Sequence, residues 1–415
     1  MSVFRILRSL RYASIHRDAT AYHGRFQTEM CLAKFRRKEI RNYASIPSQT
    51  SSQVSMWHSF VKRRKWIIPA GVGISLLAVL QWKIFSRHSH SEKDRGTPGP
   101  INGIVVKCYC CLPLRITSRL WGWLASIEVP QIFRPTFYGL YAKVFRANLE
   151  EIDLDLTSFP NLVEFFIRPL KDGVRPIAQN VDIVSPADGK VLHYGPVTSC
   201  RVEQVKGVTY SLDHFLGEPN WPRTNVSLEN VEDKDCEYLK SLLKNPKNHL
   251  YQLIIYLAPG DYHRFHSPTD WQIRFRRHFQ GKLLSVNPLI AGWLPDLFTL
   301  NERVVYIGEW AGGFMSYAAV GATNVGSIKV YCDRALATNT KKWPKEKQYD
   351  DASLGRTNIS KGQMFGEFRM GSTIVLLFEA PPDFHFSLQS GQTIKVGQPL
   401  SKNNQTLDKQ LHSSA

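Results

Sequence analysis

The chain has 415 residues, of which 43% are hydrophobic and 21% charged, and this composition describes a globular protein and excludes a disordered one. Its formal net charge of +18 is concentrated at one end, since residues 1–95 carry +13 and the other 320 residues only +5. A nucleic-acid enzyme would carry its basic patch on the folded body, so this distribution argues against nucleic acid as a partner.

Residues 1–45 predict a mitochondrial presequence. They hold ten Lys and Arg residues against three acidic residues. Arg5, Arg8 and Arg11 recur every three residues with apolar residues between them, a pattern typical of an Arg-rich targeting helix. A disordered basic tail is the alternative interpretation. The basic stretch at 46–65 follows, and we expect it on the matrix side of the membrane.

A transmembrane anchor is predicted at 66–85. The seventeen residues from Trp66 to Trp82 contain no charge, and as a helix they span about 25 Å, the short end of what a bilayer requires. Tryptophan at both ends suits the two membrane interfaces. The segment 86–111 begins with a polar linker, which disfavours a buried core helix. Together with the presequence, the anchor predicts a single-pass protein of the mitochondrial inner membrane, with its catalytic domain facing the intermembrane space.

The body, 112–415, is predicted to be a single domain. Its first part, from Leu112 to about Phe145, is helical and aromatic, and these helices are expected either to pack on the body or to lie on a membrane. From Asn161 onward the pattern is mainly one of short strands broken by Gly and Pro. Neither a repeat nor a βαβ alternation occurs. The predicted fold class is therefore α+β: a β-rich catalytic core with peripheral helices, preceded by one transmembrane helix and a basic presequence.

The expected elements of the body follow from these local patterns. Strands are expected at Val181–Val184, Lys190–Tyr194, Leu250–Leu257, Val304–Ile307, Phe314–Val320, Ser327–Cys332 and Thr373–Phe378. Helices are expected near Leu162–Ile167 and Asp233–Leu243. Two polar stretches, Glu218–Asn248 and Asp333–Asn358, are expected to be surface insertions between strands.

A candidate nucleophile stands where the last of these strands begins. Gly371 and Ser372 directly precede the apolar run Ile374–Phe378. A serine at the entry to a buried strand suits a reaction of the chain on itself, because its hydroxyl can attack the preceding carbonyl, and a glycine there adds no side chain to block the approach. The GxSxG elbow of α/β-hydrolases is absent, since Met370 and Ile374 stand where its glycines would be.

Two histidines and an aspartate are candidates to act with this serine. His263 and His266 follow the apolar strand Leu250–Leu257, and imidazole titrates near neutrality, as a general base or proton donor must. Asp188 lies in a turn shaped by Pro and Gly, where it either orients a neighbour or only stabilises its own turn. A Ser372–His266–Asp188 assembly would follow triad logic, although spacing alone does not establish it.

No metal site is predicted. The two histidines lack the HExxH pattern. The seven cysteines are scattered, and no second pair completes a zinc site with the cluster at Cys108, Cys110 and Cys111.

Several blocks, in this order, resemble the phosphatidylserine decarboxylase family of the mitochondrial inner-membrane type. The blocks are EFFIRPL (164–170), SPADGK (185–190), DYHRFHSP (261–268), NERV (301–304), KGQMFGEF (361–368) and GST (371–373). The likeness extends from about Leu112 to Gly397. No single block is specific, but their order and number are.

The resemblance implies a self-processing enzyme whose pyruvoyl cofactor is made from Ser372. His266, oriented by Asp188, would deprotonate Ser372, whose oxygen attacks the Gly371 carbonyl and forms an ester. Elimination then cuts the chain between Gly371 and Ser372 and leaves dehydroalanine, which hydrolyses to the pyruvoyl group and ammonia. Residues up to Gly371 become a large chain, and Ser372–Ala415 become a small chain.

The same resemblance implies the reaction and the partners. The amine of phosphatidylserine forms a Schiff base with the pyruvoyl ketone, which accepts the electrons released as carbon dioxide leaves. His263 would then protonate the carbanion equivalent, and hydrolysis releases phosphatidylethanolamine. The implied partners are phosphatidylserine, membrane lipid, and the large and small chains of the same precursor; a homodimer is left open.

Three alternatives remain at this stage. The main one is a membrane-tethered serine hydrolase that uses Ser372, His266 and Asp188 on another molecule and keeps its chain intact. The others are a noncatalytic lipid-binding scaffold and a pyruvoyl decarboxylase of a soluble amino acid. One departure from many relatives is Met370 in place of leucine, which preserves volume and apolarity, so we expect a small effect on self-cleavage.

Overall fold

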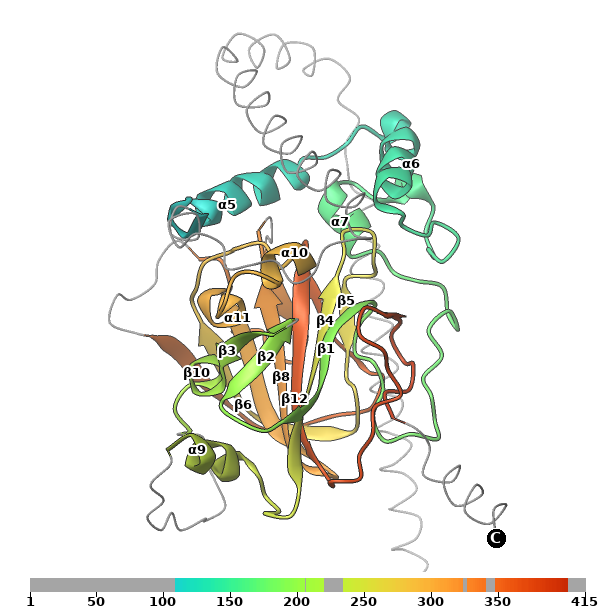
Figure 1. Cartoon of the computed structure of the whole chain (residues 1–415). Helices are drawn as coiled ribbons and strands as arrows, with labels where there is room; N and C mark the ends of the chain where they lie inside the picture. Colours follow the sequence, from blue (N-terminus) through green and yellow to red (C-terminus); the bar gives the residue numbers. More distant parts are fainter. Residues whose placement is uncertain (1–108, 206, 220–233, 324–326, 341–347, 402–415) are drawn as a thin grey trace, which may run out of the picture. The chain divides into compact units, whose positions relative to one another are not determined.

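The computed structural model describes residues 109–205, 207–219, 234–323, 327–340 and 348–401 (Figure 1). The predicted presequence, the stretch at 46–65 and the anchor at 66–85 lie outside the described residues. Among the residues that are described, no helix is long and apolar enough to cross a membrane.

The described part contains thirteen strands and several short helices. The helices are α5 (Leu114–Ala125), η1 (Gln131–Phe133), α6 (Arg134–Phe145), η2 (Leu156–Ser158), α7 (Leu162–Phe166), α8 (Leu212–Leu216), α9 (Lys234–Leu242), α10 (Pro288–Ala291) and α11 (Leu297–Leu300). The strands are β1 (Gly189–Val197), β2 (Arg201–Val205), β3 (Val208–Ser211), β4 (His249–Leu257), β5 (Arg264–His266), β6 (Trp271–Phe279), β7 (Arg303–Trp310), β8 (Gly313–Gly321), β9 (Ile328–Val330), β10 (Tyr349–Ile359), β11 (Met364–Phe368), β12 (Ser372–Ala380) and β13 (Thr393–Ile394).

The centre of the fold is an antiparallel sheet of eight strands, in the order β10-β6-β7-β8-β12-β4-β1-β13. Strand β12 lies inside it, and all nine of its residues are buried. Side chains alternate between the two faces of a strand, so Val375 and Leu377 enter one apolar cluster whereas Ile374 and Leu376 enter another. Burial on both faces explains why β12 is an unbroken apolar run instead of an alternating one.

A different layer covers each face of this sheet. The three-stranded sheet β5-β11-β9 contributes Phe265 and Phe365 to the apolar cluster that contains Ile374. The pair β2-β3 and the short helices α8 and α11 contribute Tyr210 and Phe298 to the cluster on the other face. The two apolar clusters hold the central strand in place from both sides.

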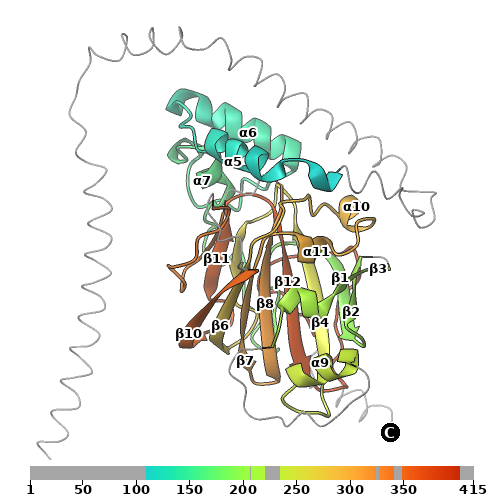
Figure 2. The same cartoon turned by 90° about the vertical axis from the view of Figure 1, so that its left-hand side faces the viewer.

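Helices α5, α6 and α7 lie at the same end of the sheet in both views, and α9 lies at the opposite end (Figures 1 and 2). The three helices form an apolar cluster of their own, which includes Phe165 and Phe166 of α7. This cluster also contains Met370, two residues before β12 begins. The helical end of the sheet is therefore the end at which Ser372 lies.

The β-rich α+β class is confirmed, and most expected strands lie within the observed ones. The strand expected at Val181–Val184 is wrong, because Val184 makes only an isolated bridge with Pro399. The insertion expected at Asp333–Asn358 is also wrong in its second half, which contains most of β10. Strand β10 lies at the edge of the sheet, and an edge strand can keep polar, exposed side chains.

Strand β6 was not expected at all. Its sequence WQIRFRRHF is rich in charge, yet it lies inside the main sheet. Its Arg276 is buried in an ion pair with Asp333, and its Arg277 in another with Asp351. Because the partners lie far along the chain, the local pattern could not indicate that these arginines are buried.

Candidate active site

Ser372 is the first residue of β12 and lies between two neighbouring strands. It pairs with Leu257, the last residue of β4, and with Gly321, the last residue of β8. Its side chain is fully buried, and its Oγ has no hydrogen-bond partner. A buried hydroxyl without a partner loses its hydration and gains nothing in return. The adjacent hydroxyl of Thr373 shares this property, so what distinguishes Ser372 is its position directly after Gly371.

The chain makes a sharp bend just before this serine. Met370 has φ +100°, a value that non-glycine residues rarely adopt and that costs about 1–3 kcal/mol. Its thioether sulfur accepts a hydrogen bond from the indole N–H of Trp121 in α5, at 3.1 Å. The helical end of the molecule thus holds the residue before the predicted cleavage site in a strained conformation.

Gly371 has free space beside its α-carbon. A Cβ built on this glycine would meet no atom within 4 Å. The free space agrees with the expectation that this position gives a nucleophile access to the backbone carbon.

His263 lies in the loop that follows β4, close in sequence to the partner of Ser372. The imidazole is fully buried, and its ring centroid lies 3.9 Å from that of Phe166. Nδ1 lies 2.9 Å from the carbonyl oxygen of Asp261, which can only accept, so Nδ1 carries the proton and Nε2 is bare. Nε2 has no partner. Burial lowers the pKa of His263 to about 3, so the imidazole is neutral at pH 7.

The loop of His263 is tied to the chain that leads to Ser372. The backbone N–H of Phe368, in β11, donates to the His263 carbonyl at 2.9 Å. Only Arg369, Met370 and Gly371 separate Phe368 from the serine. The structure therefore brings the histidine loop and the predicted cleavage site to the same end of the sheet.

His266 closes the short strand β5. Its Nδ1 lies 2.9 Å from the carbonyl oxygen of Gly362, and its Nε2 lies 3.2 Å from the hydroxyl of Tyr262. The carbonyl places the proton on Nδ1, which leaves Nε2 as the basic atom that accepts from the tyrosine. Burial lowers the pKa of His266, although the Gly362 carbonyl and the nearby charge of Asp188 act in the opposite direction.

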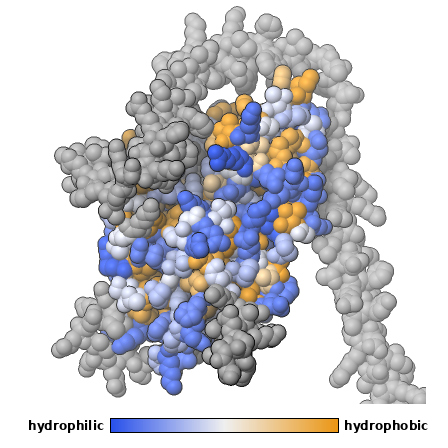
Figure 3. Space-filling model, turned by 45° about the vertical axis from the view of Figure 1, so that its right-hand side comes forward, coloured by the Kyte–Doolittle hydropathy of each residue, from blue (hydrophilic) through white to orange (hydrophobic). Residues whose placement is uncertain are grey.

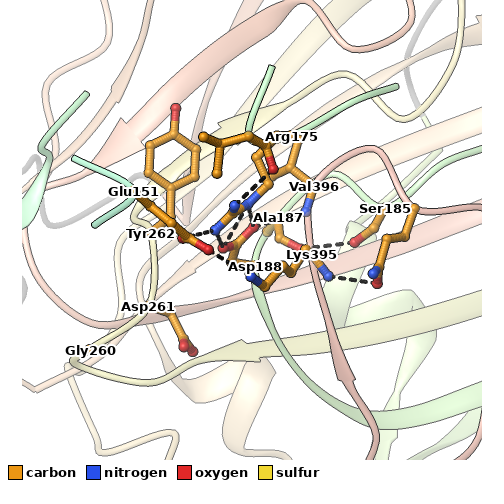
Figure 4. A network of polar contacts seen from close by, with 12 residues as sticks. Glu151, Arg175, Ser185, Ala187, Asp188, Gly260, Asp261, Tyr262, Lys395 and Val396 are labelled. Atoms are coloured by element: carbon orange, nitrogen blue, oxygen red, sulfur yellow. Dashed lines mark hydrogen bonds and ion pairs between the residues drawn. The ribbon is translucent and has the colours of Figure 1, made fainter. Parts of the chain in front are cut away.

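Asp188 makes a different set of contacts from the one that the triad predicts. Its carboxylate accepts from Arg175, with Nε at 3.0 Å and Nη2 at 2.5 Å, and from the backbone N–H of Val396 at 2.9 Å. Figure 4 shows Arg175 between this carboxylate and that of Glu151. The carbonyl of Gly362, and not Asp188, is hydrogen-bonded to the imidazole of His266.

This acidic network joins two parts of the chain that self-cleavage would separate. Lys395 bonds to Glu151 at 2.8 Å, and Val396 bonds to Asp188 (Figure 4). Burial alone would raise the pKa of Glu151, but its hydrogen bonds from Arg175 and Lys395 lower it to about 2. The network is therefore charged at neutral pH and links the segment after Ser372 to the segment before it.

The four predicted site residues thus lie around one end of the sheet without direct hydrogen bonds among them. Neither imidazole is hydrogen-bonded to the Ser372 hydroxyl, which has no partner. The roles assigned to Ser372, His266, Asp188 and His263 stay predictions.

Arg175 and Tyr262 were not singled out from the sequence. Tyr262 stands inside DYHRFHSP, so its place next to the two histidines was a usable signal. Arg175 comes thirteen residues before Asp188 in a stretch without periodicity, and no pattern there indicates the pairing. Among the described residues, no group of three or more His, Cys, Asp or Glu side chains is placed to hold a metal ion.

Comparison with known proteins gives one consistent family. The family model described as "Phosphatidylserine decarboxylase" matches residues 162–402. The mitochondrial phosphatidylserine decarboxylase proenzyme of Pongo abelii is 48% identical over 303 residues, which cover 71% of this chain and 73% of that protein. Mitochondrial phosphatidylserine decarboxylase proenzyme 1 of Schizosaccharomyces pombe is 40% identical, with 80% and 90% covered. Its counterpart in Saccharomyces cerevisiae is 36% identical, with 94% and 93% covered.

Proposed function

The chain belongs to the phosphatidylserine decarboxylase family, and from this premise we propose how its own residues make and use the active site. It is a self-processing carboxy-lyase that converts phosphatidylserine to phosphatidylethanolamine and carbon dioxide. Relatives named as decarboxylase proenzymes do not favour the alternative of a membrane-tethered serine hydrolase.

One observation carries the assignment of the nucleophile. The Ser372 hydroxyl is fully buried and unpartnered, directly after a glycine whose α-carbon faces free space. Its oxygen attacks the carbonyl carbon of Gly371, and the peptide bond becomes an ester. Elimination then removes the proton from the Cα of residue 372 and breaks the bond between its Cβ and this oxygen, which leaves with Gly371 as its carboxylate. Hydrolysis of the resulting dehydroalanine releases ammonia and leaves a ketone at position 372.

The two histidines act in different proton transfers. His266 takes the proton of Ser372, because its Nε2 is held as the basic atom by the bond between Nδ1 and Gly362. To do so it must exchange the Tyr262 hydroxyl for that of the serine. Asp188 acts on His266 through its charge, without a direct hydrogen bond.

His263 delivers the proton that replaces the carboxylate of the substrate. Its bare Nε2 in the uncut chain means that it must gain a proton before it can act as a donor. Its low pKa opposes this step in the uncut chain. A negatively charged substrate beside the ring favours the charged imidazolium and therefore raises that pKa.

The residues around Ser372 fit a pyruvoyl group that is made in place. The group needs no binding pocket of its own, because it replaces the buried serine at the start of β12. When formed, it supplies a ketone that accepts the substrate amine and draws off the electrons left as carbon dioxide departs. Around it, β12 pairs with both β4 and β8 and keeps the small chain, Ser372–Ala415, inside the sheet of the large chain after cutting.

The helical end suits a lipid substrate. Of the 16 large apolar side chains that are exposed in the described residues, 13 lie between positions 112 and 154, and Ile132 and Trp123 are 82% and 63% exposed. Figure 3 shows apolar side chains gathered at the end where α6 lies. Such a surface marks a binding site, and with α7 and Met370 in the same apolar cluster it lies close to the active site. We assign it to the membrane that carries phosphatidylserine.

The location follows the relatives, which are mitochondrial proenzymes. For this chain we propose the inner membrane, with residues 1–45 as presequence, 66–85 as a single anchor and the domain 112–415 facing the intermembrane space. The charge pattern and the uncharged run of the sequence support this topology.

Intact-mass measurement of the purified protein tests the proposed function. The expected result is two chains, with the small chain beginning at residue 372 and lighter by one ammonia than a chain that begins with serine. The hydrolase alternative predicts instead one chain that keeps the Ser372 hydroxyl and becomes acylated there. An active preparation of that second kind contradicts the self-cleavage scheme.

A further inference from the structure

Arg168 is a buried cation that forms no ion pair, although the carboxylates of Asp188, Asp261 and Glu151 act on it from a longer distance. It follows α7, is 3% exposed, and takes part in none of the ion pairs formed among the described residues. Its Nη2 donates to the carbonyl oxygens of Gly260 at 2.7 Å and Asp261 at 3.3 Å. Its Nε and Nη1 have no hydrogen-bond partner. Two charged donors are therefore buried and unused.

The neighbouring Arg175 shows how unusual this is. Its guanidinium is also mostly buried, but it contacts the carboxylates of both Asp188 and Glu151 (Figure 4). Leaving a buried charge unpaired is strongly unfavourable, and native structures rarely do so without a functional reason. The difference between the two arginines indicates that the ligand of Arg168 is an anion that the protein itself does not supply.

The unused donors lie in the proposed active site. Arg168 Nη2 and His263 Nδ1 both bond to the carbonyl oxygen of Asp261, so the guanidinium and the imidazole are neighbours. The imidazole also packs on Phe166, two residues before Arg168. The bare Nε2 of His263 and the hydroxyl of Ser372 likewise have no partner.

We propose that Arg168 binds the phosphodiester of the substrate headgroup through one of its two unused N–H donors, Nε or Nη1. This assignment rests on the proposed function. Because Nη2 already donates to Gly260 and Asp261, the two unused donors lie on different edges of the guanidinium, and each can make a single charge-assisted hydrogen bond to a phosphate oxygen. The site is thus an anion subsite that fixes the headgroup of the lipid beside the histidine.

The phosphodiester suits this cation better than the substrate carboxylate does. The carboxylate loses its charge as it leaves as neutral carbon dioxide, so a fixed cation on it would stabilise the starting state more than the transition state. The phosphodiester keeps its charge throughout and is still present in the product. A cation bound to it holds the substrate without opposing the reaction.

Anion binding at Arg168 also prepares His263. Burial is the main cause of the low pKa of His263, and the charge of Arg168 lowers it further. A phosphodiester on the guanidinium compensates that charge, and the imidazole can then take up the proton that it must later donate. The two residues are linked through the Asp261 carbonyl that they share.

The test uses steady-state kinetics of the matured full chain in mixed micelles. The variants are Arg168→Met, which removes the charge, and Arg168→Lys, which keeps the charge but replaces the planar guanidinium by an ammonium group. Arg264→Met is the matched control, since Arg264 lies in β5 near the same loop but is only partly buried and donates its Nε to Ile167. For each we measure kcat, KM for phosphatidylserine, and inhibition by phosphatidylethanolamine and by uncharged diacylglycerol.

In Arg168→Met, KM for phosphatidylserine and the inhibition constant of phosphatidylethanolamine should rise together, by about 10- to 100-fold, as expected for one or two charge-assisted hydrogen bonds. Inhibition by diacylglycerol should not change. Arg168→Lys should fall between wild type and Arg168→Met, and Arg264→Met should stay within about threefold of wild type, as for a partly exposed charge that forms no ion pair with a described residue.

Three results overturn the assignment. If KM rises while inhibition by phosphatidylethanolamine is unchanged, the ligand is the carboxylate and not the phosphodiester. If neither constant changes, the guanidinium only holds the loop at Gly260 and Asp261. If both Arg168→Lys and Arg168→Met remain uncut, the residue acts in maturation. Failure of the proposed function is separate, because it would appear as absent cutting or absent carbon dioxide release in the wild type.

Discussion

Polar side chains are buried at both ends of β12, but those at one end are hydrogen-bonded and those at the other end are not. At the far end, Glu379 is fully buried and its carboxylate is fully engaged. It accepts hydrogen bonds from the backbone N–H groups of Lys244, Asn245 and Phe314 and from the side chain of Asn248. At the near end, the hydroxyls of Ser372 and Thr373 are equally buried and have no partner.

Within a single strand, this difference distinguishes a side chain that stabilises the fold, Glu379, from one that reacts, Ser372. The four hydrogen bonds to the Glu379 carboxylate offset the free-energy cost of burying its charge. They also connect β8 and the segment after α9 to the end of β12. A hydroxyl without a partner, placed after a strained residue, gives up stability at the place where the chain has to react. Single substitutions at β12 and around the active site test this contrast.

Ser372→Ala should abolish both cutting and activity, because no other group can attack the Gly371 carbonyl. Gel analysis should show one uncut chain. The matched control is Thr373→Val, which removes the adjacent unpartnered hydroxyl at nearly constant volume and should leave cutting intact. A normal small chain from Ser372→Ala, or an uncut chain from Thr373→Val, would show that the position of the hydroxyl does not decide the reaction.

The two histidines should differ in which step they support. His266→Ala should block maturation, because it removes the base for Ser372. His263→Ala should permit some cutting but lower decarboxylation by about 100-fold or more, the usual contribution of a general acid. The measurement is carbon dioxide release per mole of matured small chain. Equal turnover in matured His263→Ala protein would remove the role assigned to it.

Glu379→Ala should destabilise the chain without preventing cutting. Four donors lose their acceptor, and each one left buried costs about 1–3 kcal/mol, so we expect a loss of at least about 3 kcal/mol. Urea unfolding in the Ser372→Ala background keeps one covalent chain and reports the change. A loss below about 1 kcal/mol would contradict the structural role of this carboxylate.

Acid should destabilise the uncut chain partly through His263. The pKa in the folded state is about 3, below the ordinary value near 6.5, so the stability from the neutral imidazole is present above pH 6.5 and is lost as the pH falls toward 3. Between pH 6.5 and 4.5 this amounts to about 2 kcal/mol. In the Ser372→Ala background, His263→Asn should show a shallower loss in urea unfolding over this range; an identical slope would contradict the buried neutral state.

Met370→Leu should have the smallest effect. Leucine preserves the apolar volume but removes the sulfur that accepts from Trp121, at a cost of about 1 kcal/mol. We expect cutting to proceed at nearly the wild-type rate, measured by the time course of small-chain formation. A large slowing would mean that the bond between Trp121 and Met370 positions the Gly371 carbonyl, and Trp121→Phe should then reproduce it.

Much of the core could be predicted because it depends on local pattern. The strands at Leu250–Leu257 and Thr373–Phe378 correspond to β4 and β12, whose apolar runs are long enough to indicate burial on both faces. The local pattern does not predict β6, because acidic residues far along the chain pair with its buried arginines. It does not predict β10 either, because this strand lies at the edge of the sheet and is polar. Local pattern cannot report a charge that is compensated from elsewhere.

The chemical identity of the site came from short blocks of sequence: a glycine before a serine, two histidines three residues apart, and an aspartate in a turn. Their contacts came only from tertiary structure. Asp188 pairs with Arg175 and Val396, whereas Arg168, seven residues before Arg175, is buried without an ion pair to any described residue and with two unpartnered nitrogens. Residue type determines which protons and charges a chain can offer, but a hydrogen bond between loops depends on how the strands beneath them bring the loops together.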